Sequence, residues 1–118
     1  MIKVGECYYH NEIEHLVIAV SKNKNKCLIV SITSNNYDKS CELNTEDIID
    51  NNGNQVLKHT SYISYTHAQE FEPYKTYEEF RKIFSYRCNI TDELLQQIKN
   101  GALKSKYLQK RFKKYFEE

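Results

Sequence analysis

Hydrophobic and polar residues alternate with different periods in the two parts of the chain. Up to residue 74, the apolar runs are short, rich in β-branched residues and separated by polar loops, which predicts strands. From residue 75 onward, apolar positions recur every three to four residues, which predicts helices. No low-complexity linker separates the parts, so we expect one α+β domain over 1–118. It would have a β part over 1–74 and a helical part over 75–118.

The two strongest strand signals are HLVIAVS over 15–21 and CLIVSIT over 27–33. An asparagine-rich loop separates them, and asparagine tolerates the left-handed conformation that short hairpin loops require. A loop at 23–25 keeps the apolar residues on one face, with three expected pairs: Val20 with Leu28, Ile18 with Val30, and Leu16 with Ile32. The same register puts His15 directly across from Thr33, on the other face at the open end of the hairpin.

Weaker signals complete the β part. Further strands are expected over 4–10, 41–43, 61–65 and 68–74, a helical turn within 45–49 and a turn at 51–54. Pro73 would mark the end or an edge of the last strand.

Capping residues define the expected helices. Thr76 and Glu79 form a capping box before an apolar stripe that includes Phe80, Ile83 and Phe84. Thr91 caps a second helix, which should stop near Gly101, and a third begins at about Lys104.

Composition and charge limit the class of protein without naming a function. The chain has 118 residues, of which 40% are hydrophobic and 28% charged, as in globular domains. Its net charge is +1, yet residues 67–118 hold eleven bases and eight acids. A basic cluster near the C-terminus suits either phosphate contact or the dipole at a helix end. No apolar run is long enough for a membrane span and no signal segment is visible, so we expect a cytoplasmic protein without a membrane partner.

Cysteine and histidine spacing gives no metal motif. The four cysteines are 20, 14 and 47 residues apart, and the four histidines form no compact ligand pattern. We therefore predict no metal and no cofactor. Cys7 and Cys27 lie in strand-like segments and are expected in the core.

Several short motifs together resemble a known family. HLVIAVS, a short turn and CLIVSITS resemble the paired strands of the MazF/PemK (Kid-like) toxins, in which the second strand ends in Pro-Ile-Thr-Ser. The segments DKSC at 38–41 and HTSYISY at 59–65 are similar to motifs of an uncharacterised branch of MazF-like proteins. The likeness covers roughly residues 5–68, over half of the chain.

The resemblance implies a fold and an activity. It implies a small SH3-like antiparallel β-barrel, here followed by two or three C-terminal helices, and a homodimer in many members. It also implies cleavage of single-stranded RNA without a metal. Thr33 and Ser34 match the family's Thr-Ser, whereas His15-Leu16 stands where the family has Arg-Pro.

The residues at the open end of the hairpin can supply the chemistry. Metal-independent RNA cleavage needs a base for the 2′-hydroxyl proton, an acid for the leaving oxygen and donors for the charged phosphorane. Histidine suits proton transfer at neutral pH, and a threonine hydroxyl can donate to a phosphate. We predict His15, Thr33 and Glu14 as catalytic, with Glu14 as a second base or an orienting group. The alternative is that His15 and Thr33 form an ordinary cross-strand pair.

The candidate RNA contacts are Ser34, Asp38, Ser40, His59, Tyr62, Lys110 and Arg111. The polar residues could line one cleft with the hairpin end, whereas an Asp38 or Ser40 side chain could instead cap a turn. Tyr62 and Tyr65 fall on opposite faces of a strand, so one belongs in the core and the other could stack on a base.

Two functional hypotheses remain. The first is a MazF-like ribonuclease toxin that acts on single-stranded RNA and is neutralised by an antitoxin protein. The second is a non-catalytic barrel that binds RNA or a protein segment in the same groove.

Overall fold

The computed structural model describes residues 2–72 and 77–117 and has an α+β fold. Six antiparallel strands form one curled sheet in the order β4-β5-β3-β2-β1-β6. The strands are β1 (Glu6–His10), β2 (His15–Asn23), β3 (Lys26–Thr33), β4 (Glu42–Leu43), β5 (Ser61–Phe71) and β6 (Phe84–Asn89). The α-helices are α1 (Tyr77–Ile83) and α2 (Asp92–Lys104), and the 3₁₀-helices are η1 (Thr45–Asp47) and η2 (Lys110–Tyr115).

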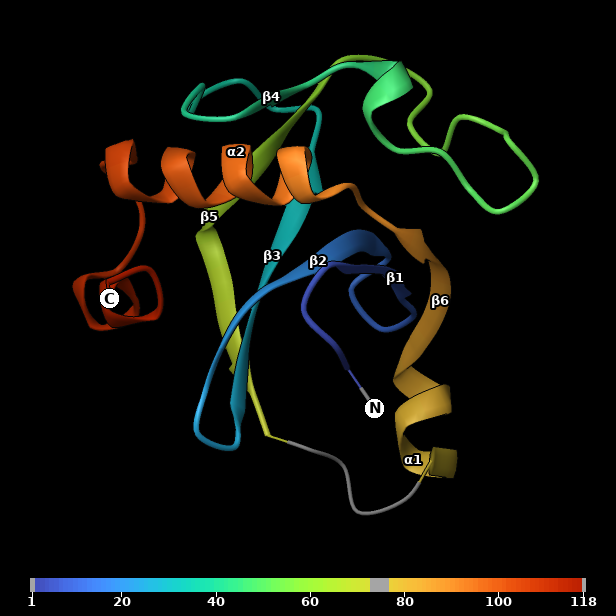
Figure 1. Cartoon of the computed structure of the whole chain (residues 1–118), viewed down its shortest axis with the longest axis horizontal. Coiled ribbons are helices and arrows are strands. Elements are labelled where there is room, and N and C mark those ends of the chain that lie inside the picture. The colour runs from blue at the N-terminus through green and yellow to red at the C-terminus, as the bar shows by residue number, and fades with distance from the viewer. Residues whose placement is uncertain (1, 73–76, 118) are drawn as a thin grey trace.

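Helices cover both faces of the curled sheet, so its central strands are buried on both sides. In Figure 1, α2 lies across the sheet beside β5, whereas α1 lies at the opposite end, below β6. On the α2 side, Ile98 packs with Ile18 and Val30. On the other side, Phe80 of α1 packs with Tyr8 and other apolar residues. Cys7 and Cys27 are buried, as predicted.

The hairpin of β2 and β3 confirms one predicted pair and corrects another. Ile18 lies opposite Val30 as expected, but Leu28 pairs with Ser21 instead of Val20 because a β-bulge interrupts the ladder. Lys26 pairs with Asn23, which leaves a two-residue turn with Lys24 at a φ of 56°. The predicted loop at 23–25 and the pair of Val20 with Leu28 are therefore wrong. A two-residue turn with left-handed backbone matches the twist of the strands, and the bulge absorbs the extra residue.

The expected strands at 61–65 and 68–74 form the single strand β5. Ser31 pairs with Ser64 and Ile29 with Gln69, so four residues of β5 lie opposite Val30 at a large irregularity. β5 ends at Phe71, and the prediction about Pro73 lies outside the described residues.

The C-terminal part differs from the prediction in one strand and one helix. Thr91 caps α2 by accepting a hydrogen bond from the Leu94 amide (3.1 Å), as predicted. Phe84 begins the strand β6 instead of continuing a helical stripe, because β1 has a free edge that pairs with it. α2 runs past Gly101 to Lys104, and a short 3₁₀-helix replaces the expected third α-helix. The capping prediction for Thr76 lies outside the described residues. None of the helices in the described ranges is long and apolar enough to cross a membrane.

Candidate nucleic-acid groove

A groove of about 340 Å³ opens where β2 begins and β3 ends. Its walls come from the ends of the four strands β1, β2, β3 and β5, from the β1–β2 turn and from the loop before β5. The lining residues are Tyr9, Glu14, His15, Leu16, Ile32, Thr33, Ser34, Val56, Leu57, Lys58, His59 and Ser61.

The groove brings together five of the residues that the sequence singled out: Glu14, His15, Thr33, Ser34 and His59. The first four come from the hairpin end that was expected to hold them. Glu14 closes the β1–β2 turn with a left-handed φ of 58°, and its amide donates to the His10 carbonyl (2.8 Å). The paired register ends at Val17 and Ser31, and its continuation sets His15 opposite Thr33.

Hydrogen bonds order the loop that leads to His59, whose carbonyl accepts from the Ser61 hydroxyl at the start of β5 (3.1 Å). The Val56 amide donates to the Ile48 carbonyl (3.0 Å). The Asp50 carboxylate accepts from the amides of Asn52 and Asn54 (2.9 Å each), which closes the turn around Gly53, at a φ of 82°. The turn predicted at 51–54 is confirmed.

Both groove histidines use the same ring nitrogen for a backbone contact. His15 Nδ1 lies 3.4 Å from the Ile32 carbonyl oxygen, and His59 Nδ1 lies 3.1 Å from that of Thr60. Because a carbonyl oxygen only accepts, we assign the Nδ1–H tautomer to both rings. The lone pair of each neutral imidazole is then on Nε2, so each ring can act in proton transfer through that atom.

The Thr33 hydroxyl is set up as a donor. Its oxygen accepts a hydrogen bond from the Asn35 amide (3.1 Å). The hydroxyl proton remains to be donated, and a phosphate oxygen in the groove is a suitable acceptor.

Sequence reasoning missed the apolar floor of the groove and one cation. The floor residues are Tyr9, Leu16, Ile32, Val56 and Leu57, and Lys58 adds a positive charge to the rim. The alternation in the first strand could have placed Tyr9 on the same face as Cys7. No local signal shows that the segment at 56–58 folds onto the hairpin end.

The structure places Asp38 and Ser40 away from this groove. Asp38 is buried, and its Oδ1 accepts from the amide (3.0 Å) and hydroxyl (2.6 Å) of Ser40. Its Oδ2 accepts from the buried Ser105 hydroxyl (2.7 Å), just beyond the end of α2. The contact between Asp38 and Ser40 therefore fits the alternative expectation, in which one of these side chains caps a turn.

Three other residues of the motif segments also lie outside the groove lining. Tyr65 is fully buried, whereas Tyr62 is partly exposed and pairs with Thr33 across the strands. Cys41 is buried, and burial raises the pKa of its thiol to about 11, which disfavours a thiolate nucleophile.

Lys110 and Arg111 lie in η2, at the far end of the hairpin from His15. The Ser21 hydroxyl donates to the Tyr115 carbonyl of η2 (2.6 Å). Ser21 is six residues along β2 from His15, or about 20 Å along an extended strand. The structure therefore does not bring Lys110 and Arg111 to the groove.

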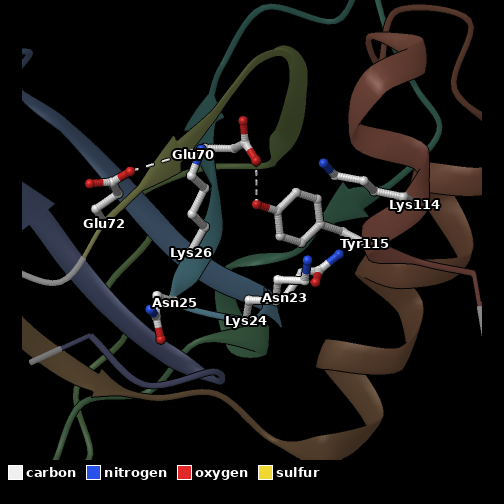
Figure 2. Close-up of a pocket in the computed structure, with 8 residues that line it drawn as sticks. All are labelled: Asn23, Lys24, Asn25, Lys26, Glu70, Glu72, Lys114 and Tyr115. Atoms are coloured by element: carbon white, nitrogen blue, oxygen red, sulfur yellow. Dashed lines mark hydrogen bonds and ion pairs between the residues drawn. The ribbon is translucent and has the colours of Figure 1, made fainter.

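A second hollow, of about 790 Å³, lies between η2 and the β2–β3 turn. Figure 2 shows Tyr115 pointing at Glu70, and Lys26 pointing at Glu72. The Tyr115 hydroxyl donates to Glu70 (2.5 Å), which lowers the pKa of that carboxyl, and Lys26 Nζ lies 3.9 Å from Glu72. Charges of both signs line the hollow, so it offers no convergent set of groups of one sign.

A third cluster lies at the irregularity of β5. Ser64 Oγ is 2.7 Å from His67 Nδ1 and 3.2 Å from the Tyr37 hydroxyl. Ser64 is only 2% exposed, so its hydroxyl is not accessible to a substrate, and the chain of hydrogen bonds serves the local structure.

Within residues 2–72 and 77–117, His, Cys, Asp and Glu side chains form no group of three or more that could hold a metal ion. In comparisons with models of known protein families and with curated proteins, the chain has no match.

Proposed function

We propose that the chain is an endoribonuclease that cuts single-stranded RNA without a metal, and that it acts as a MazF/PemK-like toxin. The observation that carries the proposal is that His15, His59 and Thr33 line one groove. Two imidazoles and a hydroxyl donor are a sufficient set for cleavage by the 2′-hydroxyl.

The proposed reaction is an in-line transesterification. One neutral histidine takes the 2′-hydroxyl proton through Nε2, and the 2′-oxygen attacks the adjacent phosphorus. The other histidine, protonated, gives its proton to the leaving 5′-oxygen, so that a 2′,3′-cyclic phosphate and a 5′-hydroxyl form. Thr33 and Lys58 supply a hydrogen bond and a positive charge to the phosphorane oxygens. We assign the base to His15, with Glu14 beside it as an orienting carboxylate or second base.

The family assignment remains part of the proposal. It rests on the Ile-Thr-Ser motif, the hairpin that carries it and the curled antiparallel sheet, which suits an SH3-like barrel. As a toxin it would act in the cytoplasm, pair as a homodimer and be neutralised by an antitoxin that covers the groove.

One observation favours a second candidate function. His15-Leu16 replaces the Arg-Pro dipeptide, and with it the cation that the family places beside the threonine. Without that cation, the groove could bind RNA or a protein segment without cutting. Lys58 is the cation that the groove offers instead.

The test is incubation of the purified protein with a long single-stranded RNA in EDTA. We expect discrete fragments from the wild type, and a loss of at least 100-fold in rate from His15→Ala and His59→Ala. Thr33→Ala should also cut more slowly. His67→Ala is the matched control, because this exposed histidine lies outside the groove lining.

Intact RNA in every lane would reject the nuclease and leave the binding module. Growth arrest on expression, relieved by His15→Ala, would support the toxin assignment, whereas harmless expression at a high level would contradict it.

A further inference from the structure

Tyr9 lines the groove, but no step of the proposed reaction uses it. It lies on β1, where it pairs with Leu16 of β2 on one side and Ser85 of β6 on the other. Its ring is neither buried in the core nor fully exposed. A partly exposed aromatic ring in an apolar floor is a surface on which a flat ligand can stack.

A bulge in the edge strand holds a cation over this ring. Cys7 pairs with Cys88 and Tyr8 with Tyr86, which leaves Arg87 as the extra residue of β6. Bulges re-aim side chains, and the Arg87 guanidinium carbon lies 5.3 Å from the centroid of the Tyr9 ring. This cation–π contact fixes the ring in place and adds a positive charge beside the groove.

The groove as a whole has two chemical characters. Tyr9, Val56 and Leu57 are apolar, whereas the two histidines, Thr33 and Lys58 are polar or charged. A nucleotide also has an apolar part and a charged part, because its base has an apolar face and its phosphate is anionic. Proteins that bind single-stranded nucleic acid pair such aromatic platforms with basic groups.

We propose that Tyr9 is a base-stacking residue, which holds one unpaired nucleobase of a single-stranded substrate beside the phosphate at the histidines. Arg87 positions the ring and attracts the strand. This inference rests on the proposed function for its substrate class, but it concerns binding and does not require cleavage.

The probe is a fluorescently labelled, mixed-sequence 2′-O-methyl oligoribonucleotide, which lacks the nucleophile and stays intact. We expect Tyr9→Leu to weaken its binding roughly 5- to 100-fold, the range for loss of one stacked base, and Tyr9→Phe to bind nearly as the wild type does. The chain contains a matched control. Tyr77 on α1 is also exposed and has an arginine, Arg81, over its ring at 5.4 Å, but it lies outside the groove lining. Tyr77→Leu should leave the affinity unchanged.

A second variant covers the case in which Tyr9→Leu fails to fold. Arg87 is exposed, so Arg87→Met should fold, and it should weaken binding roughly 2- to 5-fold, whereas Arg81→Met should not. The proposal is overturned if Tyr9→Leu folds and binds as tightly as the wild type, or if Arg87→Met has no more effect than Arg81→Met.

The two proposals fail in different ways. If the wild type binds the probe through Tyr9 but leaves unmodified RNA intact in EDTA, the stacking residue stands and the nuclease is rejected. If the wild type cuts RNA, and Tyr9→Leu binds and cuts as well as the wild type does, only the stacking role of Tyr9 is rejected. A wild type that neither binds the probe nor cuts unmodified RNA rejects both.

Discussion

The hydroxyl of Tyr65 lies against Gly101, in the space that the β-carbon of any other residue would need. That hydroxyl donates to the Ile98 carbonyl of α2 (2.6 Å), and Tyr65 is fully buried. A β-carbon at position 101 would also lie 2.8 Å from the Ser40 carbonyl oxygen and 2.9 Å from Cys41 Cβ. Strand β5, the loop before β4 and helix α2 thus meet at a point where only glycine fits.

We predict that Gly101→Ala destabilises the protein by about 1–3 kcal/mol, the usual cost of overpacking a core. The sign is informative, because the same substitution within a solvated helix stabilises by about 1 kcal/mol. Urea unfolding followed by circular dichroism measures the change. Gln97→Ala, on the exposed surface of α2, should alter the stability by less than about 0.5 kcal/mol. An unchanged or higher stability for Gly101→Ala would contradict this packing at Gly101.

We also predict that Asp38→Ala acts on stability and not on RNA binding. The substitution removes the acceptor of three hydrogen bonds, from the Ser40 amide, the Ser40 hydroxyl and the buried Ser105 hydroxyl. Leaving such donors unpaired costs about 1–3 kcal/mol. Lys39→Ala, at the exposed neighbouring position, is the control. Normal stability together with weaker binding of a single-stranded oligonucleotide would instead support the RNA contact expected from the sequence.

Strands were predictable from the sequence where the apolar pattern of a segment agrees with its pairing to a neighbouring strand. The β-branched runs gave β2 and β3, and Ile18 opposite Val30 followed from keeping apolar residues together. The strand β6 is not among the predicted elements, although Phe84, Tyr86 and Cys88 alternate with polar residues, because Phe80, Ile83 and Phe84 also have the spacing of one helix face. That alternation was the available signal. Pairing with the free edge of β1 makes this segment a strand and not a helix. That edge lies almost 80 positions earlier in the chain.

Hairpin pairing made the local half of the candidate groove predictable, and the motif at 59–65 alone suggested His59. Residues 14–15 and 33–34 are joined by a hairpin, so its register was enough to bring them together. The loop carrying Lys58 and His59 and the strand carrying Tyr9 reach the groove through long-range folding. The DKSC segment matched a motif, yet its Asp38 and Cys41 pack at α2. A motif alone does not show whether its polar residues serve the structure or a ligand.

His10 should make the stability depend on pH. Burial holds the pKa of His10 below its ordinary value of 6.5, and its Nδ1 lies 3.3 Å from the Glu12 amide and 3.4 Å from the Ile13 amide, both of which need an unprotonated acceptor. As the pH falls below about 6.5, the unfolded chain gains a proton that the folded chain resists. The free energy of unfolding should therefore fall from pH 7.5 to pH 5.5.

Urea unfolding at a series of pH values measures this effect, with His10→Gln as the variant that cannot titrate. Its stability should be lower at pH 7.5, because the glutamine fills the site less well, but should fall less steeply toward pH 5.5. The same slope in both proteins would show that His10 is not the group responsible.

Cys7 and Cys88 should be the pair of cysteines that oxidation joins. They lie directly opposite each other on β1 and β6, at a Cα separation of about 4.5–5.5 Å for antiparallel partners, which a disulfide can span. Contact with the Cys88 thiol and burial raise the pKa of the Cys7 thiol. Both are buried, so the reaction requires opening of the edge strand β6.

With oxidised glutathione as the disulfide reagent, the chain should lose two of its four thiols and the mass of two hydrogen atoms, without retaining glutathione. Closing this long loop should raise the stability by roughly 4 kcal/mol. The variants Cys27→Ser and Cys41→Ser should still form the Cys7–Cys88 disulfide, because neither Cys27 nor Cys41 has a cysteine opposite it. The variant Cys7→Ser should not form it. A bond that involves Cys27 or Cys41 in the folded protein would contradict the register of β1 with β6, and with it the position of Arg87 over Tyr9.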